Sequence, residues 1–96
     1  MRFNEYYMKD ETKLFKALAN ERRLMILNHL TAISPLTVGV IAKRIKLSFK
    51  STSRHLQVLY SAGIVSREQV NLEMRYYPNR DNKFWAKPVN QIIRPK

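Results

Sequence analysis

The stretch from residue 37 to residue 62 constrains the fold of this 96-residue chain more than any other part. It predicts two short helices joined by the tight turn Lys46-Leu47-Ser48, because apolar residues recur at helical spacing on both sides of that turn. We expect the two helices to pack against each other through their inward residues, which are Val40, Ile41, Ile45, Phe49, Thr52, Leu56 and Leu59. The stretch therefore has the form of a helix-turn-helix. We expect Thr37 and Ser48 to be the N-caps of its two helices, and Gly63 to supply the left-handed residue that ends the second.

The outward side of the second helix carries polar and basic groups at positions i, i+3, i+4 and i+7. These residues are Lys50, Ser53, Arg54 and Gln57. Side chains at this spacing are neighbours along one side of a helix. An ammonium, a hydroxyl, a guanidinium and an amide group can hydrogen-bond to base edges and phosphates in a DNA major groove, and they are poorly suited to catalysis. We therefore predict that this side of the helix contacts DNA bases.

The charge of the chain indicates a polyanionic partner. Lys and Arg number 18 against 7 Asp and Glu, which gives a net charge of +11. No acidic residue lies between Glu21 and Glu68, and the basic residues in that span are Arg22, Arg23, Lys43, Arg44, Lys46, Lys50, Arg54 and Arg67. We expect Lys43, Arg44 and Lys46, beside the predicted turn, to attract phosphates. From charge alone, the alternative is a basic surface that is only solvated.

Several classes of protein are excluded by what the sequence lacks. It has no cysteine, which excludes disulfides and thiolate metal sites. No apolar run approaches the roughly 18 residues of a membrane span, so we expect a cytoplasmic protein with no membrane partner. No nucleophile with an adjacent base, paired carboxylates, glycine-rich phosphate loop or metal-ligand cluster is evident, so we predict no enzymatic activity and no cofactor.

The segment before the helix-turn-helix predicts two further helices. The first spans about residues 10–19, and the second runs from Glu21 to about Leu30 with Asn20 as its N-cap. The second is the most apolar and should be central. The aromatic residues near the start either extend the first helix or pack as an arm, and they cover either their own core or a second subunit, which we favour. The residues expected at such a dimer interface from this segment are Phe3, Tyr6, Tyr7, Leu14 and Phe15.

After the helix-turn-helix the apolar period changes to that of strands. Residues 64–70 and 74–79 predict a hairpin with Asn71 at its tip, and Pro78 should end the second strand. A short helical segment beyond Asp81 should complete the dimer interface with Phe84, Trp85, Ile92 and Ile93. We predict one domain over residues 1–96, mainly α with a small β-hairpin (α+β), with the helix-turn-helix at 37–62, a wing at 64–78, and dimerisation segments at 1–19 and 80–94.

The succession helix, helix, helix-turn-helix, hairpin, helix is that of a winged helix-turn-helix, and six segments resemble one family. They are LFKALANERRLMIL at residues 14–27, LTVGVIA at 36–42, LS at 47–48, SRHLQVL at 53–59, AGIV at 62–65 and RYY at 75–77. In this order they are similar to ArsR-type bacterial or archaeal transcriptional regulators. The resemblance implies a homodimer on a pseudo-palindromic operator that usually represses transcription, with recognition-helix contacts from Lys50, Ser51, Ser53 and Arg54.

The chain also departs from the family pattern. The cysteines of the family's metal site are missing and the final segment has no histidine to pair with Asp81, so we predict that the protein is not a metal sensor. Lys46 replaces the usual glycine of the turn, so either Lys46 adopts an unfavourable φ or the turn differs. His55 occupies a position that the family shares, where it either packs or contacts a phosphate.

The wing tip departs as well. Leu72 and Glu73 replace the usual glycine and basic residues there, and an acidic tip is repelled by phosphate. We therefore expect Arg67 and Arg75, on the strands of the wing, to be its phosphate contacts.

We predict a sequence-specific regulator that binds double-stranded DNA, acts as a homodimeric repressor and leaves room for an unidentified small-molecule effector. The alternative is a winged-helix protein-interaction or architectural module that binds nucleic acid only through charge. Preference for a specific duplex over a random one separates the two.

Overall fold

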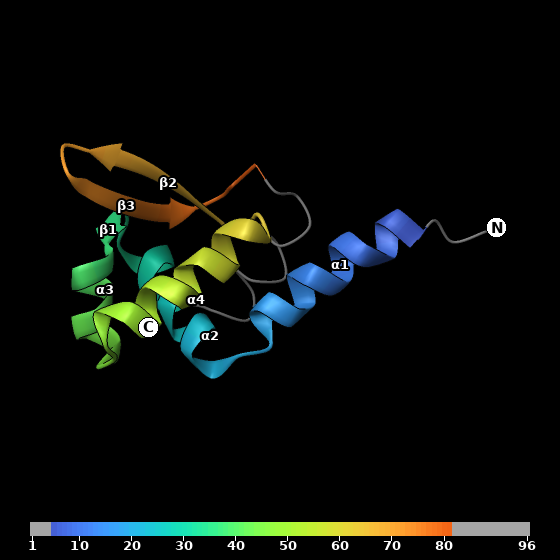
Figure 1. Cartoon of the computed structure of the whole chain (residues 1–96), viewed down its shortest axis with the longest axis horizontal. Helices are drawn as coiled ribbons and strands as arrows, with labels where there is room; N and C mark the ends of the chain where they lie inside the picture. The colour runs from blue at the N-terminus through green and yellow to red at the C-terminus, as the bar shows by residue number, and fades with distance from the viewer. Residues whose placement is uncertain (1–4, 82–96) are drawn as a thin grey trace.

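The computed structural model describes the backbone of residues 5–81 and the side chains of residues 11–81 (Figure 1). In chain order the elements are α1 (Glu5–Leu18), α2 (Glu21–Ala32), β1 (Leu36–Thr37), α3 (Val38–Ile45), α4 (Phe49–Ser61), β2 (Val65–Val70) and β3 (Glu73–Pro78). This order confirms the predicted α+β winged helix-turn-helix. α1 projects away from the other elements, and Tyr6 and Tyr7 extend it, which is one of the two alternatives given for the early aromatic residues. The predicted helical segment after Asp81 lies outside the described residues.

Each of the next three helices starts at a side chain that accepts a hydrogen bond from its first turn. Asn20 accepts from the Arg23 amide at the start of α2. Thr37 accepts from the Val40 amide at the start of α3, and Ser48 from the Ser51 amide at the start of α4. Such caps typically contribute about 0.5–2 kcal/mol each. All three predicted starts are confirmed.

The sheet has three antiparallel strands in the order β1-β3-β2. The hairpin β2–β3 was predicted, and its register of Val70 opposite Glu73 leaves a two-residue tip at which Asn71 has φ 58°. The strand β1 was not predicted from the sequence. Two residues give no alternating pattern, and β1 exists because Leu36 and Thr37 pair with Tyr76 and Arg75 of β3.

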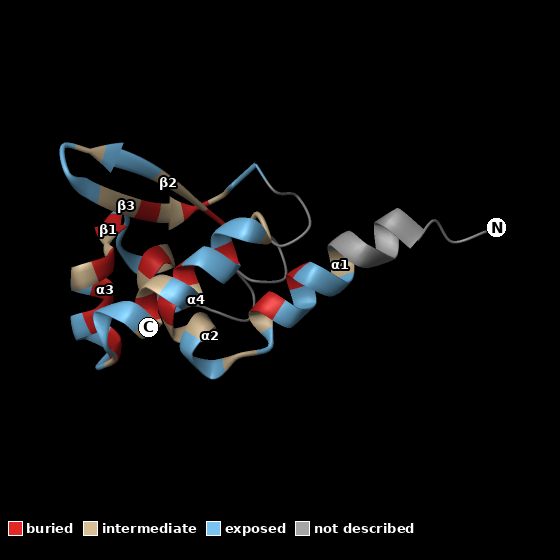
Figure 2. Cartoon of the chain, viewed as in Figure 1, coloured by how far each residue is buried: buried red, intermediate tan, exposed pale blue. Residues whose placement is uncertain are grey.

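The hydrophobic core lies between α2, α3, α4 and the base of the wing. Its fully buried side chains are Ile26, Leu27, Leu30, Ile41, Ile45, Thr52, Leu56, Leu59, Ile64 and Val65. Figure 2 shows buried segments, in red, along α2, α3 and α4 where these helices pack together. α2 is central, as predicted from its apolar sequence. In the described part of the chain, no helix has the length and apolar character that crossing a membrane requires.

Two residues predicted to face the core are exposed instead. Val40 is 41% exposed because the buried side of α3 is formed by positions 38, 41, 42 and 45, and position 40 points the other way. Phe49 is 63% exposed because it is the first residue of α4, beyond the end of the core that covers Thr52 and Leu56. Both predictions of burial are therefore wrong. The exposed Phe49 places an apolar ring on the otherwise basic surface beside the turn.

The turn between α3 and α4 keeps the backbone shape that glycine usually provides. Lys46 has φ 54° and ψ 51°, in the left-handed region, while the Leu47 amide donates to the Ala42 carbonyl at 3.0 Å. Of the two alternatives left open by the sequence, the unfavourable φ is the one observed. At the other end of α4, Gly63 has φ 74°, as predicted for the residue after this helix.

Candidate nucleic-acid interface

The outer side of α4 presents cations and polar groups to solvent. Lys50, Arg54 and Gln57 are exposed, and Ser51 and Ser53 are half-buried. Lys43 and Arg44, in the last turn of α3, and Lys46 in the turn are also exposed. Within the described part of the chain, none of these five cationic groups has a hydrogen bond or ion pair. Their charges are therefore available to a ligand.

Arg22 and Arg23, two other arginines between Glu21 and Glu68, hydrogen-bond to backbone carbonyls of the protein itself. Arg22 Nη1 donates to the carbonyl oxygen of Ile45 at 2.9 Å, at the C-terminal end of α3. Arg23 donates from Nε to the Ala17 carbonyl at 2.6 Å and from Nη2 to the Lys16 carbonyl at 3.3 Å, near the C-terminal end of α1. Cations at helix C-termini satisfy orphan carbonyls and interact favourably with the helix dipole. These two residues therefore fix helices and do not belong to the exposed set.

His55 of α4 is partly buried beside Arg23 of α2. Its Nδ1 lies 3.4 Å from Nη1 of Arg23, and since a guanidinium only donates, Nδ1 accepts and the ring proton lies on Nε2. Burial, followed by the charges of Arg23 and Arg22, lowers the pKa of His55 from its ordinary 6.5. The imidazole is therefore neutral near pH 7. These contacts agree with the packing alternative, and the phosphate contact stays a prediction.

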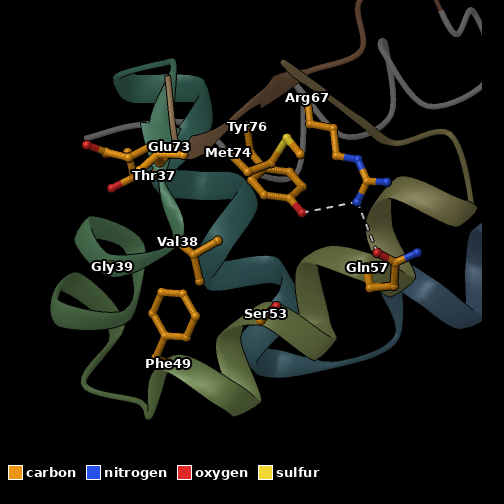
Figure 3. Close-up of a pocket in the computed structure, with 11 residues that line it drawn as sticks. Thr37, Val38, Gly39, Phe49, Ser53, Gln57, Arg67, Glu73, Met74 and Tyr76 are labelled. Atoms are coloured by element: carbon orange, nitrogen blue, oxygen red, sulfur yellow. Dashed lines mark hydrogen bonds between the residues drawn. The ribbon is translucent and has the colours of Figure 1, made fainter. Parts of the chain in front are cut away.

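Arg67 joins the wing to α4 (Figure 3). Its Nη1 donates to Oε1 of Gln57 at 3.1 Å and to the Tyr76 hydroxyl at 3.5 Å, and the guanidinium lies 3.9 Å from the centre of the Tyr60 ring. The hydrogen bond to Tyr76 is the main cause that raises the pKa of Arg67. Tyr60 and Tyr76 were not singled out from the sequence, because their meeting depends on the angle between the hairpin and α4. We call Arg67, Gln57, Tyr60 and Tyr76 the wing clamp.

The two wing arginines lie on opposite faces of the hairpin. Arg67 is paired across the strands with Tyr76, whereas Arg75 is paired with Glu68. Residues opposite each other in a ladder share a face, and the next pair along the strands points the other way. Arg67 thus faces α4, and Arg75 faces away from it beside an acidic residue. The structure does not bring these two predicted phosphate contacts together.

A groove of about 490 Å³ separates α4 from the wing. Ser53 and Gln57 line its helical side, and Phe49 lies at one end (Figure 3). Leu72 and Glu73 line it from the wing. Leu72 is 96% exposed at the tip. The groove therefore combines polar groups with two exposed apolar side chains.

The predicted dimer interface is only partly described. Leu14 is 5% exposed and packs in the core of its own subunit, which leaves it little surface for a partner. Phe15 is 59% exposed and lines a shallow apolar hollow on α1 with Glu11, Thr12, Lys16 and Ala19. Tyr6 and Tyr7 lie on α1, but their side chains are outside the described part, as are all of Phe3, Phe84, Trp85, Ile92 and Ile93.

The described part of the chain offers few clustered side chains that could bind a metal ion. The sequence has no cysteine, and no three His, Asp or Glu residues of the described part come together as metal ligands would. His55, one of two histidines in the chain, has its Nδ1 engaged by Arg23.

A comparison with models of protein families identifies one family. The family model described as "Bacterial regulatory protein, arsR family" matches residues 20–67, half of the chain. A comparison with curated protein sequences gave no match.

Three similar solved structures match most of this chain. The homodimeric winged helix-turn-helix DNA-binding domain of a possible ArsR-family regulator from Mycobacterium bovis is 26% identical with a TM-score of 0.82, over 92% of this chain and 79% of that one. The transcriptional repressor PagR of Bacillus anthracis is 26% identical with a TM-score of 0.78, over 93% and 99% of the two chains. HlyU of Vibrio cholerae is 30% identical with a TM-score of 0.75, over 93% and 97%.

Proposed function

The chain belongs to the arsR family of bacterial regulatory proteins and is a DNA-binding transcriptional regulator, not an enzyme, and from this premise we propose that it represses transcription as a homodimer on a two-fold operator. In such a dimer each α4 enters a major groove, and the two helices lie about 34–36 Å apart, one turn of DNA. Repression follows when the occupied operator overlaps the site of the polymerase.

One observation carries this proposal: the outer side of α4 and the turn before it hold cations that have no partner in the described part of the chain. A cation without an acidic neighbour keeps its full attraction for phosphate and releases DNA counterions when it binds. The polar groups between these cations can hydrogen-bond to base edges. The proposed base contacts are Lys50, Ser51, Ser53, Arg54 and Gln57.

Phosphate contacts in this proposal come first from the helix-turn-helix. Lys43, Arg44 and Lys46 supply the charge, and His55 can add a neutral donor through Nε2. Arg67 is already held by the wing clamp. We therefore propose that Arg67 mainly positions the wing and Gln57, and that Arg75 is the remaining wing cation for phosphate.

The homodimer is supported by Phe15 and by the assembly of the Mycobacterium bovis relative. A ring that is 59% exposed beside an apolar hollow on a projecting helix has surface to bury against a second subunit. The lack of cysteine and of a clustered donor set in the described part supports a regulator that does not sense metal. Any effector is then of another chemical class.

Selection from a random duplex pool, followed by affinity measurements, tests this function. We expect the selected operator to be pseudo-palindromic and to bind about 10³-fold more tightly than random duplex of the same length. Light scattering should give two subunits per complex. A reporter placed behind the operator should lose expression when the protein is present.

The rival function is an architectural or protein-interaction module that binds nucleic acid through charge alone. That module would bind all duplexes alike, and the selection would return no common sequence. An operator without two-fold symmetry would contradict the dimer, and increased reporter expression would contradict repression.

A further inference from the structure

Phe49 is an exposed aromatic residue at the position where a recognition helix begins. It is the first residue of α4, and 63% of it is exposed. In the helix-turn-helix geometry, the N-terminal residues of the second helix contact base edges. Lys50 follows Phe49 directly and is also exposed, and Ser53 lies one helical turn further on. The ring thus lies among the proposed base contacts.

The described residues around Phe49 leave most of its side chain exposed. It lies at one end of the groove between α4 and the wing, with Val38 on the near wall (Figure 3). Val38 is only 7% exposed, so it offers a small apolar area. The opposite wall is formed from the wing by residues such as Leu72 and Glu73. The ring therefore has an open side that faces the groove.

The charge around this open side restricts what can occupy it. Lys50, Arg54, Lys46 and Arg44 are exposed nearby in the chain and have no partners in the described part. A polyanion that presents an apolar group fits such a surface. In the major groove of DNA the apolar group on a base edge is the 5-methyl group of thymine, and aromatic or aliphatic side chains contact it.

We propose that Phe49 is a specificity-determining residue that selects thymine in each half-site by contact with its 5-methyl group. This inference rests on the proposed function, because it requires a specific operator bound by α4. Lys50 and Arg54 attract the DNA and hydrogen-bond to it, whereas Phe49 adds discrimination that no hydrogen bond supplies.

Replacement of thymine by deoxyuridine tests the contact because it removes only the methyl group and keeps base pairing. Each thymine of the selected operator is replaced in turn, at the same position of both half-sites, and the dissociation constant is measured by fluorescence anisotropy. At one symmetric position we expect the wild-type protein to lose about fourfold in affinity per half-site, the amount expected for one buried methyl group. Phe49→Ala should bind the thymine and deoxyuridine operators equally.

Leu72→Ala is the matched control, because Leu72 is apolar, lines the same groove and is more exposed than Phe49. It should keep the wild-type preference for thymine. Phe49→Leu should keep part of the preference, since an aliphatic side chain can also contact a methyl group.

Three results would overturn the proposal: a wild-type protein indifferent to every replacement, a Phe49→Ala protein with an undiminished preference, or a Leu72→Ala protein that loses it equally. Failure of the proposed function looks different, because the selection itself would then return no operator. Circular dichroism of each variant checks that the fold is intact.

Discussion

The helix-turn-helix and the wing use their basic residues in opposite ways. On α3, α4 and the turn between them, the cations point to solvent and have no partner in the described part of the chain. On the wing, Arg67 is bound to Gln57, Tyr76 and Tyr60. This comparison shows that net charge alone does not identify which surface of the protein binds DNA. The partners of each cation decide whether it attracts DNA or holds the protein together.

The largest expected effect comes from removing a base contact of the helix-turn-helix. Arg54→Ala should weaken operator binding by about 1–3 kcal/mol for each half-site and relax specificity at one base position. Arg75→Ala, the matched change on the wing, should cost less and leave specificity unchanged. Dissociation constants for operator and random duplex, measured for both variants, check this. An equal loss on the two duplexes for Arg54→Ala would remove its role in base selection.

The next largest effect is on stability. It comes from the two residues with a left-handed backbone conformation, Lys46 in the helix-turn-helix and Asn71 in the wing. Lys46→Gly should raise the free energy of unfolding by about 1 kcal/mol, because glycine adopts φ 54° without the strain of a side chain. Asn71→Gly at the wing tip, with φ 58°, should raise it less, since asparagine tolerates this region. Urea denaturation measures both changes.

In DNA binding the order of the two variants should be reversed, with Lys46→Gly the weaker. Lys46→Gly removes a cation and should bind every duplex more weakly, whereas Asn71→Gly should not. If the two variants bound alike, Lys46 would have no part in phosphate attraction.

A smaller effect concerns the salt dependence of binding. Lys43→Ala should lower the slope of log K against log salt by about 0.9 for each subunit, with the same loss on operator and random duplex. Arg67→Gln should leave this slope nearly unchanged but lower the melting temperature, because the guanidinium contacts of the wing clamp are lost. A slope reduced equally in both variants would show that Arg67 is a phosphate contact after all.

The smallest effect should be a pH dependence of stability that originates at His55, beside Arg23. The pKa of His55 is lowered in the folded protein by burial and by Arg23 and Arg22, so the unfolded chain binds a proton more readily. Stability from this group is complete above pH 6.5 and is lost as the pH falls from there through the folded pKa. Urea denaturation of wild type and His55→Gln at pH 7.5 and 5.5 measures it. The variant should lose less stability than wild type between these pH values.

Local features were predicted well from the sequence. The caps Asn20, Thr37 and Ser48, the end of α4 at Gly63 and the hairpin tip at Asn71 each depend on residues within one turn of the chain. Such features need no knowledge of how elements pack. The change of apolar period along the chain, from helical to that of strands, then predicted the order of the elements.

Features that depend on packing between elements were missed. β1 needs β3 to form, the wing clamp needs the angle between hairpin and helix, and the exposure of Phe49 needs the end of the core to be located. For Val40, the apolar pattern was assigned the wrong phase, because Val38 and Ala42 were not counted on the inner side of α3. Of the candidate site, the outward position of Lys50, Arg54 and Gln57 follows from helical spacing alone.

The wing clamp also bears on the thermodynamics of association with DNA. Gln57 and the hairpin are held together by Arg67 in the free protein, so little conformational entropy between these two parts remains to be lost when a complex forms. Preorganisation of this kind lowers the cost of association without any added contact. The unfavourable entropy of complex formation should therefore arise mainly from the long side chains of the helix-turn-helix, which are ordered only when they meet the duplex.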